Sequence, residues 1–186
     1  MITIRKITDV ELMREANAVT MNGAPSKMTL AQGYFVRHSP IRTQMFVMHT
    51  DNAYKSVCDH LVRHHVGVQP FVGTSRPDRI GVETVEDYRK MPKHMMLMFN
   101  ADAFLNICEQ RLCAGAEEPT RNFVYAMVKA MEPVDLDLAL RAVPLCVREG
   151  FCHQWKCCGF IHSKMWAAAR ESYVDRSVLK GGKENG

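Results

Sequence analysis

The chain has 186 residues, of which 47% are hydrophobic and 24% charged, as in ordinary globular domains. No apolar run approaches the roughly 20 residues of a membrane-spanning helix, and the N-terminus has no apolar signal core. The net charge of +4 is too small for a dedicated nucleic-acid binder, but it suits a protein that binds an anionic small molecule.

The length and the cysteine content predict one domain in a reducing compartment. Residues 1–179 are long enough to bury a single core, and the polar, glycine-containing tail at 180–186 is expected to be disordered. Seven cysteines are an odd number, and their spacing is not that of a disulfide framework. We therefore expect a cytoplasmic protein with reduced thiols.

The N-terminal third alternates between short strands and helices. A first strand is expected at 1–4, and Thr8 with Glu11 forms a capping-box pattern that opens a helix through Ala18. A second helix is expected at 30–37, followed by an alternating strand at 43–50.

A helical pattern then covers residues 53–65. Tyr54, Val57, Cys58 and Leu61 recur at helical spacing and predict a buried stripe, which leaves His60, Arg63 and His64 together on the opposite face. A solvated basic face is the plain alternative.

The remaining elements complete an α+β pattern. A long loop is expected from Val68 to Met91, then a strand at 94–99, a helix from its N-cap Asn100 to Cys113, a helix that begins near Pro119, and an amphipathic helix from Asp135 to Val147. The predicted fold is a single α+β domain with a small, mostly antiparallel sheet flanked by helices.

Four segments of the chain carry the chemistry that can be read from sequence. They are Arg37-His38-Ser39-Pro40, His60-Leu61-Val62-Arg63-His64-His65, Gly73-Thr74-Ser75-Arg76, and Asn100 to Asn106 leading into Arg111-Leu112-Cys113-Ala114-Gly115-Ala116-Glu117 with Arg121. In this order and spacing they resemble the flavin-dependent thymidylate synthases, whose signatures are a His-x-Ser-Pro turn, an Arg-His-Arg motif ending in Ser-x-Arg, and an Arg-Leu-Cys helix end. The resemblance covers roughly residues 30–132.

The resemblance implies a set of site residues. It assigns His38, Arg63, His64, His65 and Asn106 to FAD. It assigns His60, Thr74, Ser75, Arg76 and Arg111 to the pyrimidine nucleotide, with Arg111 as the catalytic residue that stabilises charge on the ring. It also implies a homotetramer with shared active sites, methylene-tetrahydrofolate and NADPH as co-substrates, dUMP to dTMP as the reaction, and no membrane or nucleic-acid partner.

The chain departs from the family pattern at several positions. His65 stands where the family has a third motif residue, an arginine, Val68 replaces a serine, and Pro70-Phe71 replaces an Asn-Glu pair. These substitutions indicate a divergent member, and we expect the pocket wall nearest the substrate to be more apolar than in typical members. They leave open a variant pyrimidine (hydroxy)methylase and a catalytically silent nucleotide-binding homologue.

Two further features allow a structural interpretation beside the functional one. Arg111 shares the apolar stripe of its helix with Phe104 and Ile107, so it is either part of a buried ion pair or a nucleotide ligand. The cluster Cys152-His153-x-x-x-Cys157-Cys158-x-x-x-His162 could bind zinc, but it has no Cys-x-x-Cys pair. We expect free thiols in a C-terminal helix there and no metal.

Overall fold

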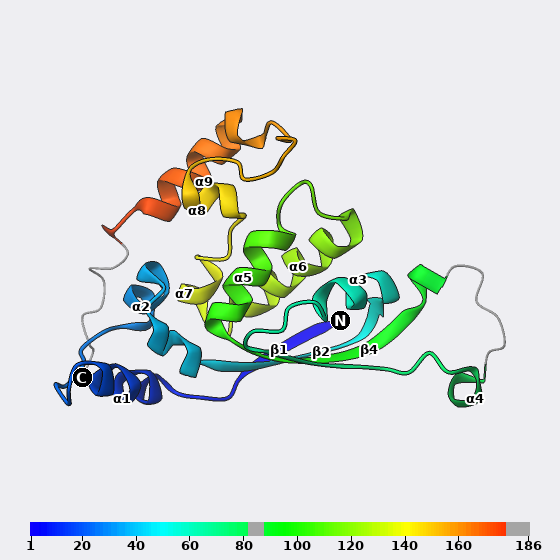
Figure 1. Cartoon of the computed structure of the whole chain (residues 1–186), viewed down its shortest axis with the longest axis horizontal. Coiled ribbons are helices and arrows are strands. Elements are labelled where there is room, and N and C mark those ends of the chain that lie inside the picture. The colour runs from blue at the N-terminus through cyan, green and yellow to red at the C-terminus, as the bar shows by residue number, and fades with distance from the viewer. Residues whose placement is uncertain (82–87, 178–186) are drawn as a thin grey trace.

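An antiparallel sheet with helices on one face forms the centre of this computed structural model (Figure 1), which describes residues 1–81 and 88–177. The strands are β1 (Ile2–Lys6), β2 (Met45–Tyr54), β3 (Val68–Val72) and β4 (Pro92–Asn100). The helices are α1 (Val10–Thr20), α2 (Leu30–Val36), α3 (Lys55–Leu61), α4 (Pro77–Ile80), α5 (Ala101–Arg111), α6 (Glu118–Met131), α7 (Leu136–Ala139), α8 (Leu145–Glu149) and α9 (Lys164–Val174), with 3₁₀ turns at Ser39–Thr43, Tyr88–Lys90 and Phe160–His162.

The described strands are ordered β1-β2-β4-β3, and each neighbouring pair is antiparallel. The α+β prediction is therefore confirmed. β3 lies at the edge of this sheet, where Pro70 can be accommodated although it has no backbone N–H to donate.

The core lies between the sheet and helices α3, α5 and α6. Phe46 and Phe99 point inward from adjacent strands with ring centroids 5.9 Å apart, and Phe104 of α5 stacks on Phe99 at 5.6 Å. All three rings are fully buried, and such pairs add to the free energy of burial. Because Phe99 precedes α5 by only two residues, this stack fixes the start of that helix against the sheet.

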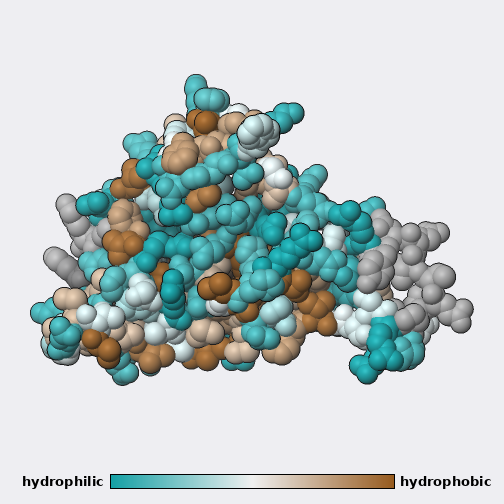
Figure 2. Space-filling view, viewed as in Figure 1, coloured by the Kyte–Doolittle hydropathy of each residue, from teal (hydrophilic) through white to brown (hydrophobic). Residues whose placement is uncertain are grey.

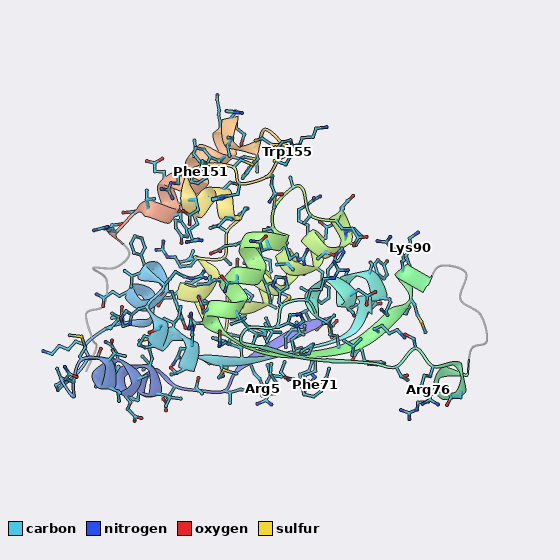
Figure 3. All side chains as sticks on the ribbon, viewed as in Figure 1. Arg5, Phe71, Arg76, Lys90, Phe151 and Trp155 are labelled. Carbon is cyan, nitrogen blue, oxygen red and sulfur yellow. The ribbon has the colours of Figure 1, made fainter. Side chains whose placement is uncertain are left out.

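On the opposite face of the sheet, below β1, β2 and β4 in Figure 1, none of the described helices is present. Strand alternation directs Met45, Val47, Met96, Met98 and Phe71 to this face, which we call the outer face. Figure 3 shows Arg5 and Phe71 pointing away from the helices, and hydrophobic surface appears along the lower margin of Figure 2. Phe71 is 48% exposed there.

Side-chain caps set the helix starts. Asn100 accepts a hydrogen bond from the backbone N–H of Ala103 at 2.8 Å, which confirms the predicted cap of α5. The capping box at Thr8 and Glu11 is wrong: Asp9 caps α1 by accepting from Leu12 N, while the Thr8 hydroxyl donates to the Thr43 carbonyl at 2.8 Å. The hydrogen bond of Thr8 therefore connects the segment before α1 to the segment before β2.

The predicted helix at 53–65 is shorter than expected. β2 continues through Tyr54, so α3 begins at Lys55 and ends at Leu61. Tyr54 is 44% exposed, not part of the buried stripe, whereas Val57, Cys58 and Leu61 are buried as predicted. Arg63, His64 and His65 consequently lie in the turn that follows the helix.

Three further predictions need correction. The expected loop Val68–Met91 contains β3, α4 and the turn Tyr88–Lys90, with residues 82–87 outside the description. The expected helix Asp135–Val147 is broken into α7 and α8, because Pro144 precedes a new helix start. The segment Cys152–His162 forms turns, not a packed helix, and Cys157 and Cys158 are exposed.

Within the described residues, none of the helices has the length and apolar character needed to cross a membrane. The expected tail at 180–186 lies outside the described residues, as does the predicted domain end at 179.

Candidate active site

Arg111 is the last residue of α5 and lies against the turn after α3. Its Nε donates to Nε2 of His64 at 3.2 Å, and one terminal nitrogen donates to the carbonyl of His60 at 3.1 Å. The side chain is partly buried. The fold therefore brings together three of the residues that the sequence assigned to the nucleotide and the flavin.

Among the described residues, no carboxylate forms a salt bridge with Arg111. Burial lowers the pKa of this guanidinium, and the nearby Arg63 lowers it further. An arginine still keeps its charge at neutral pH. The buried ion pair considered for Arg111 is thus not found among these residues, and both acceptors of its hydrogen bonds are uncharged.

His64 is held in its neutral form. Burial, followed by the charges of Arg111 and His65, lowers its pKa to about 4. At neutral pH its Nε2 accordingly carries no proton and accepts the hydrogen bond from Arg111. A neutral imidazole orients the guanidinium without cancelling its charge.

Two residues at the start of α6 complete this side of the site. Nδ1 of His60 lies 2.7 Å from the hydroxyl of Thr120 and 3.3 Å from a carboxylate oxygen of Glu117. Glu117 also accepts from Arg89 at 2.7 Å. Sequence reasoning missed Glu117 and Thr120, although their place around Pro119 at a predicted helix start was a usable signal.

Gly67 fixes the turn that carries these histidines. Its backbone has φ +73°, and a Cβ added there would collide with the side-chain amide of Asn100. The backbone N–H of Asn100 donates to the Gly67 carbonyl at 3.0 Å. The turn after α3 is thereby pinned to the N-terminus of α5.

His38 and Asn106 lie on another side of α5. The Asn106 amide oxygen accepts from Arg37 at 2.6 Å, and Arg37 also pairs with Glu109 at 2.8 Å and with Asp102 at 2.9 Å. Nδ1 of His38 is buried and has no hydrogen-bond partner among the described residues. The structure thus joins Asn106 to Arg37, a residue of the Arg37-His38-Ser39-Pro40 segment that was not assigned a role from the sequence. It leaves one ring nitrogen of His38 without a hydrogen-bond partner among the described residues.

Arg63 and His65 are exposed in the turn after α3. His65 lines an open groove of about 360 Å³ with Met45, Gly67, Gln69 and Met98. Two of these side chains, Met45 and Met98, belong to the outer face. His65 therefore lies beside the outer face of the sheet.

The segment Thr74–Arg76 lies far from Arg111 within one chain. It follows β3 on the arm that ends in α4, and Figure 3 shows Arg76 at the outer end of this arm. Arg76 pairs with Asp78 at 2.9 Å, and the carbonyl of Thr74 accepts from buried Lys93 at 2.7 Å. One chain does not bring Thr74, Ser75 and Arg76 to the Arg111 cluster.

Comparison by sequence identifies no relative, because no family model matches the chain and no curated protein does. Comparison by structure does. Thymidylate Synthase X (ThyX) from Helicobacter pylori, solved with FAD and dUMP, superimposes with a TM-score of 0.57 over 75% of this chain and 99% of that chain. A second structure of the same enzyme with FAD and dUMP gives a TM-score of 0.59 over 76% of this chain and 99% of that chain. The chain has the fold of a flavin-dependent thymidylate synthase.

The resemblance seen in the sequence is thus confirmed at the level of fold. Sequence identity with both flavin-dependent thymidylate synthase structures is 12%, which supports the architecture and a divergent chain. The roles assigned to individual residues stay predictions. About a quarter of this chain lies outside each superposition, whereas nearly the whole of the neighbour is covered.

Proposed function

We propose that this chain is a flavin-dependent enzyme that transfers a one-carbon unit to carbon 5 of a pyrimidine deoxynucleotide, converting dUMP to dTMP with methylene-tetrahydrofolate and NADPH. The single observation that carries the proposal is Arg111: a partly buried guanidinium without a carboxylate partner among the described residues, oriented by neutral His64 and the His60 carbonyl. Such a group is available for an anionic ligand.

In this proposal the residues of the chain bind and polarise the nucleotide. Arg111 holds the pyrimidine ring and stabilises negative charge that develops on it, and His64 keeps the guanidinium in place. His60, fixed by Thr120 and Glu117, forms the adjoining wall. When bound, the flavin would supply the hydride. The protein contributes position and electrostatics, so no protein nucleophile is required.

Several described residues fit a flavin. The unpartnered Nδ1 of His38 can hydrogen-bond a ligand, and the groove beside His65 offers apolar walls for a flat ring. Asn106 is already hydrogen-bonded to Arg37, so it would contact FAD only together with that arginine. These groups lie on different sides of one chain, and FAD is larger than the groove.

A homotetramer would bring the separated groups together. The outer face presents apolar side chains, Phe71 among them at 48% exposure, and none of the described helices covers it in Figure 1. By the same alternation Arg5, His49 and Gln69 also lie on this face, and exposed apolar side chains among polar ones are a common feature of subunit interfaces. A second copy packed on this face could place its arm with Arg76 near the Arg111 cluster of the first.

Flavin binding and turnover test the function directly. The purified protein should be yellow or should take up FAD in calorimetry at tens of micromolar. With dUMP, methylene-tetrahydrofolate and NADPH, mass spectrometry should find one added methyl on the nucleotide. Colourless protein without FAD uptake would rule out the flavoenzyme.

Mixed subunits test whether the site is shared. Arg76→Ala and Arg111→Ala should each abolish turnover, and mixing the two after dissociation should restore part of the activity. In a shared site some hybrid pockets contain both arginines. Absence of recovery in hybrids that are verified by native mass spectrometry would contradict a shared site.

A variant product is the second candidate. Val68 and Phe71 replace polar family residues, and alternation places them on opposite faces of β3, with Val68 buried and Phe71 exposed. Phe71 would therefore present an apolar wall to a neighbouring copy, and a site with fewer hydrogen-bonding groups distinguishes ring substituents less well. A hydroxymethyl product or a modified dCMP would support this candidate, and bound flavin without any product would support a silent homologue.

A further inference from the structure

Cysteines from separate parts of the chain meet at one small cavity. Cys113 follows α5, Cys146 lies in α8, and Cys152 and Cys158 belong to the turns before α9. All four line a cavity of about 30 Å³, next to apolar side chains such as Leu145 and Phe160. A volume of this size holds a water molecule or a metal ion, not an organic ligand.

The backbone around these thiols is arranged to stabilise sulfur with negative charge. The N–H of Gly115 donates to Sγ of Cys113 at 3.4 Å, and the N–H of Gly159 donates to Sγ of Cys157 at 3.4 Å. The backbone of Gln154 likewise forms a hydrogen bond with the side chain of Cys152, which precedes it by two residues. Backbone N–H groups directed at sulfur are the outer contacts that support metal-bound thiolates.

The segment that carries three of these cysteines has almost no core of its own. No residue from 148 to 172 is buried, while Val147 and Tyr173 at its two ends are. Phe151 is 54% exposed and Trp155 fully exposed. Small units without a sufficient apolar core are commonly held by a metal or by disulfides. This segment, at the top of Figure 1, is attached to α5 by an ion pair between Arg148 and Glu109 at 2.9 Å.

We propose that Cys113, Cys146, Cys152 and one thiolate of the Cys157–Cys158 pair bind a structural zinc ion that holds the segment 145–177 to the end of α5. Four thiolates suit tetrahedral Zn²⁺ and leave no open position for catalysis. Among the described residues no three such ligands already surround one point, so binding must draw the turns at 152–158 inward. Each thiol would release its proton to solvent, with no change of redox state.

Metal analysis of the full chain tests the proposal without reference to activity. Protein expressed with added zinc and no metal-binding tag should contain about one zinc per chain. Replacement by Co²⁺ should produce the visible absorption of a tetrahedral thiolate site. Removal of zinc with a chelator should lower Tm, and added zinc should restore it.

Substitutions identify the ligands. Cys146→Ser and the double variant Cys157→Ser with Cys158→Ser should lose the metal, whereas Cys58→Ser, at a buried thiol of α3 outside the cluster, should keep it. If Cys146→Ser does not fold, the cobalt spectrum and the chelator experiment on the wild-type chain decide the question. Wild-type protein without zinc and without a cobalt band overturns the proposal. So does iron in place of zinc, disulfide formation among these cysteines in metal-free protein, or retention of zinc in Cys146→Ser.

Discussion

Replacement of Arg111 by alanine should strongly weaken nucleotide binding while leaving the fold intact. In the proposed complex the guanidinium gives the nucleotide at least one charged hydrogen bond, and the loss of such a bond costs about 1.5–3 kcal/mol. We therefore expect the Kd for dUMP to rise roughly 10- to 150-fold.

The fold should tolerate this change because Arg111 is joined to the rest of the chain by two hydrogen bonds with uncharged acceptors, His64 Nε2 and the His60 carbonyl. At the same value of about 1.5–3 kcal/mol for each hydrogen bond of a charged group, their loss costs up to about 3–6 kcal/mol in a domain whose stability is typically about 5–15 kcal/mol. No buried carboxylate is left unpaired, since none among the described residues forms a salt bridge with Arg111.

Calorimetric titration of dUMP into FAD-loaded protein measures the effect, and circular dichroism with urea unfolding verifies the fold. Arg14→Ala serves as the matched control, because Arg14 pairs with Glu11 on α1, away from this cluster. Arg111→Lys keeps the charge but loses the planar fork, so its affinity should fall between those of the wild type and Arg111→Ala. Unchanged dUMP affinity in folded Arg111→Ala would refute the assignment, and unfolding of that variant would indicate a structural role.

Three further outcomes are expected. Since the folded-state pKa of His64 is lowered from 6.5 to about 4, its contribution to stability is complete above about pH 6.5 and is lost as pH falls toward 4. Between about pH 7 and about pH 5, urea unfolding should therefore show that the wild type loses roughly 1–2 kcal/mol of its free energy of unfolding, whereas His64→Gln does not. The raised pKa of Glu109 changes the stability in the opposite direction, but it does so in both proteins and cancels in this comparison. Gly67→Ala should destabilise the fold by about 1–3 kcal/mol, because φ is +73° and the new methyl group meets Asn100, and an unchanged urea midpoint would contradict the proposed lock between the turn and α5. Light scattering should give about 85 kDa, four times the 21.2 kDa chain, and a monomer across a range of concentrations would remove the basis for a shared site.

Local sequence signals predicted the central elements because those signals act over few residues. The cap at Asn100, the strand expected from the apolar run at 94–99 and the helix start near Pro119 are all present in the structure. The predictions were wrong where contacts between distant parts of the chain determine the local structure. Thr8 is bonded to Thr43 and leaves the cap to Asp9. Similarly, β3 exists because it pairs with β4, which its own composition, with Pro70 inside, does not indicate.

The sequence predicted those parts of the candidate site whose residues belong to a recognised motif and also lie together in the fold. The Arg-His-His turn and Arg111 were both identified in the sequence, and the structure joins His64 to Arg111. Glu117 and Thr120 were missed because their role depends on α6 packing beside α3. The cysteine cluster was incompletely seen for the same reason: Cys113 and Cys146 approach the C-terminal turns only after the chain folds.

The periodicity of α5 explains why the predicted site residues separate into two groups. Asn106 and Arg111 are five residues apart, which turns the side chains about 140° from each other around the helix axis. Asn106 accordingly meets Arg37, and Arg111 meets the turn after α3. One copy of this helix cannot direct both residues into one pocket. If both contact the same flavin–nucleotide pair, as the resemblance implies, the two residues come from different copies of the chain, and the proposed tetramer would supply that arrangement.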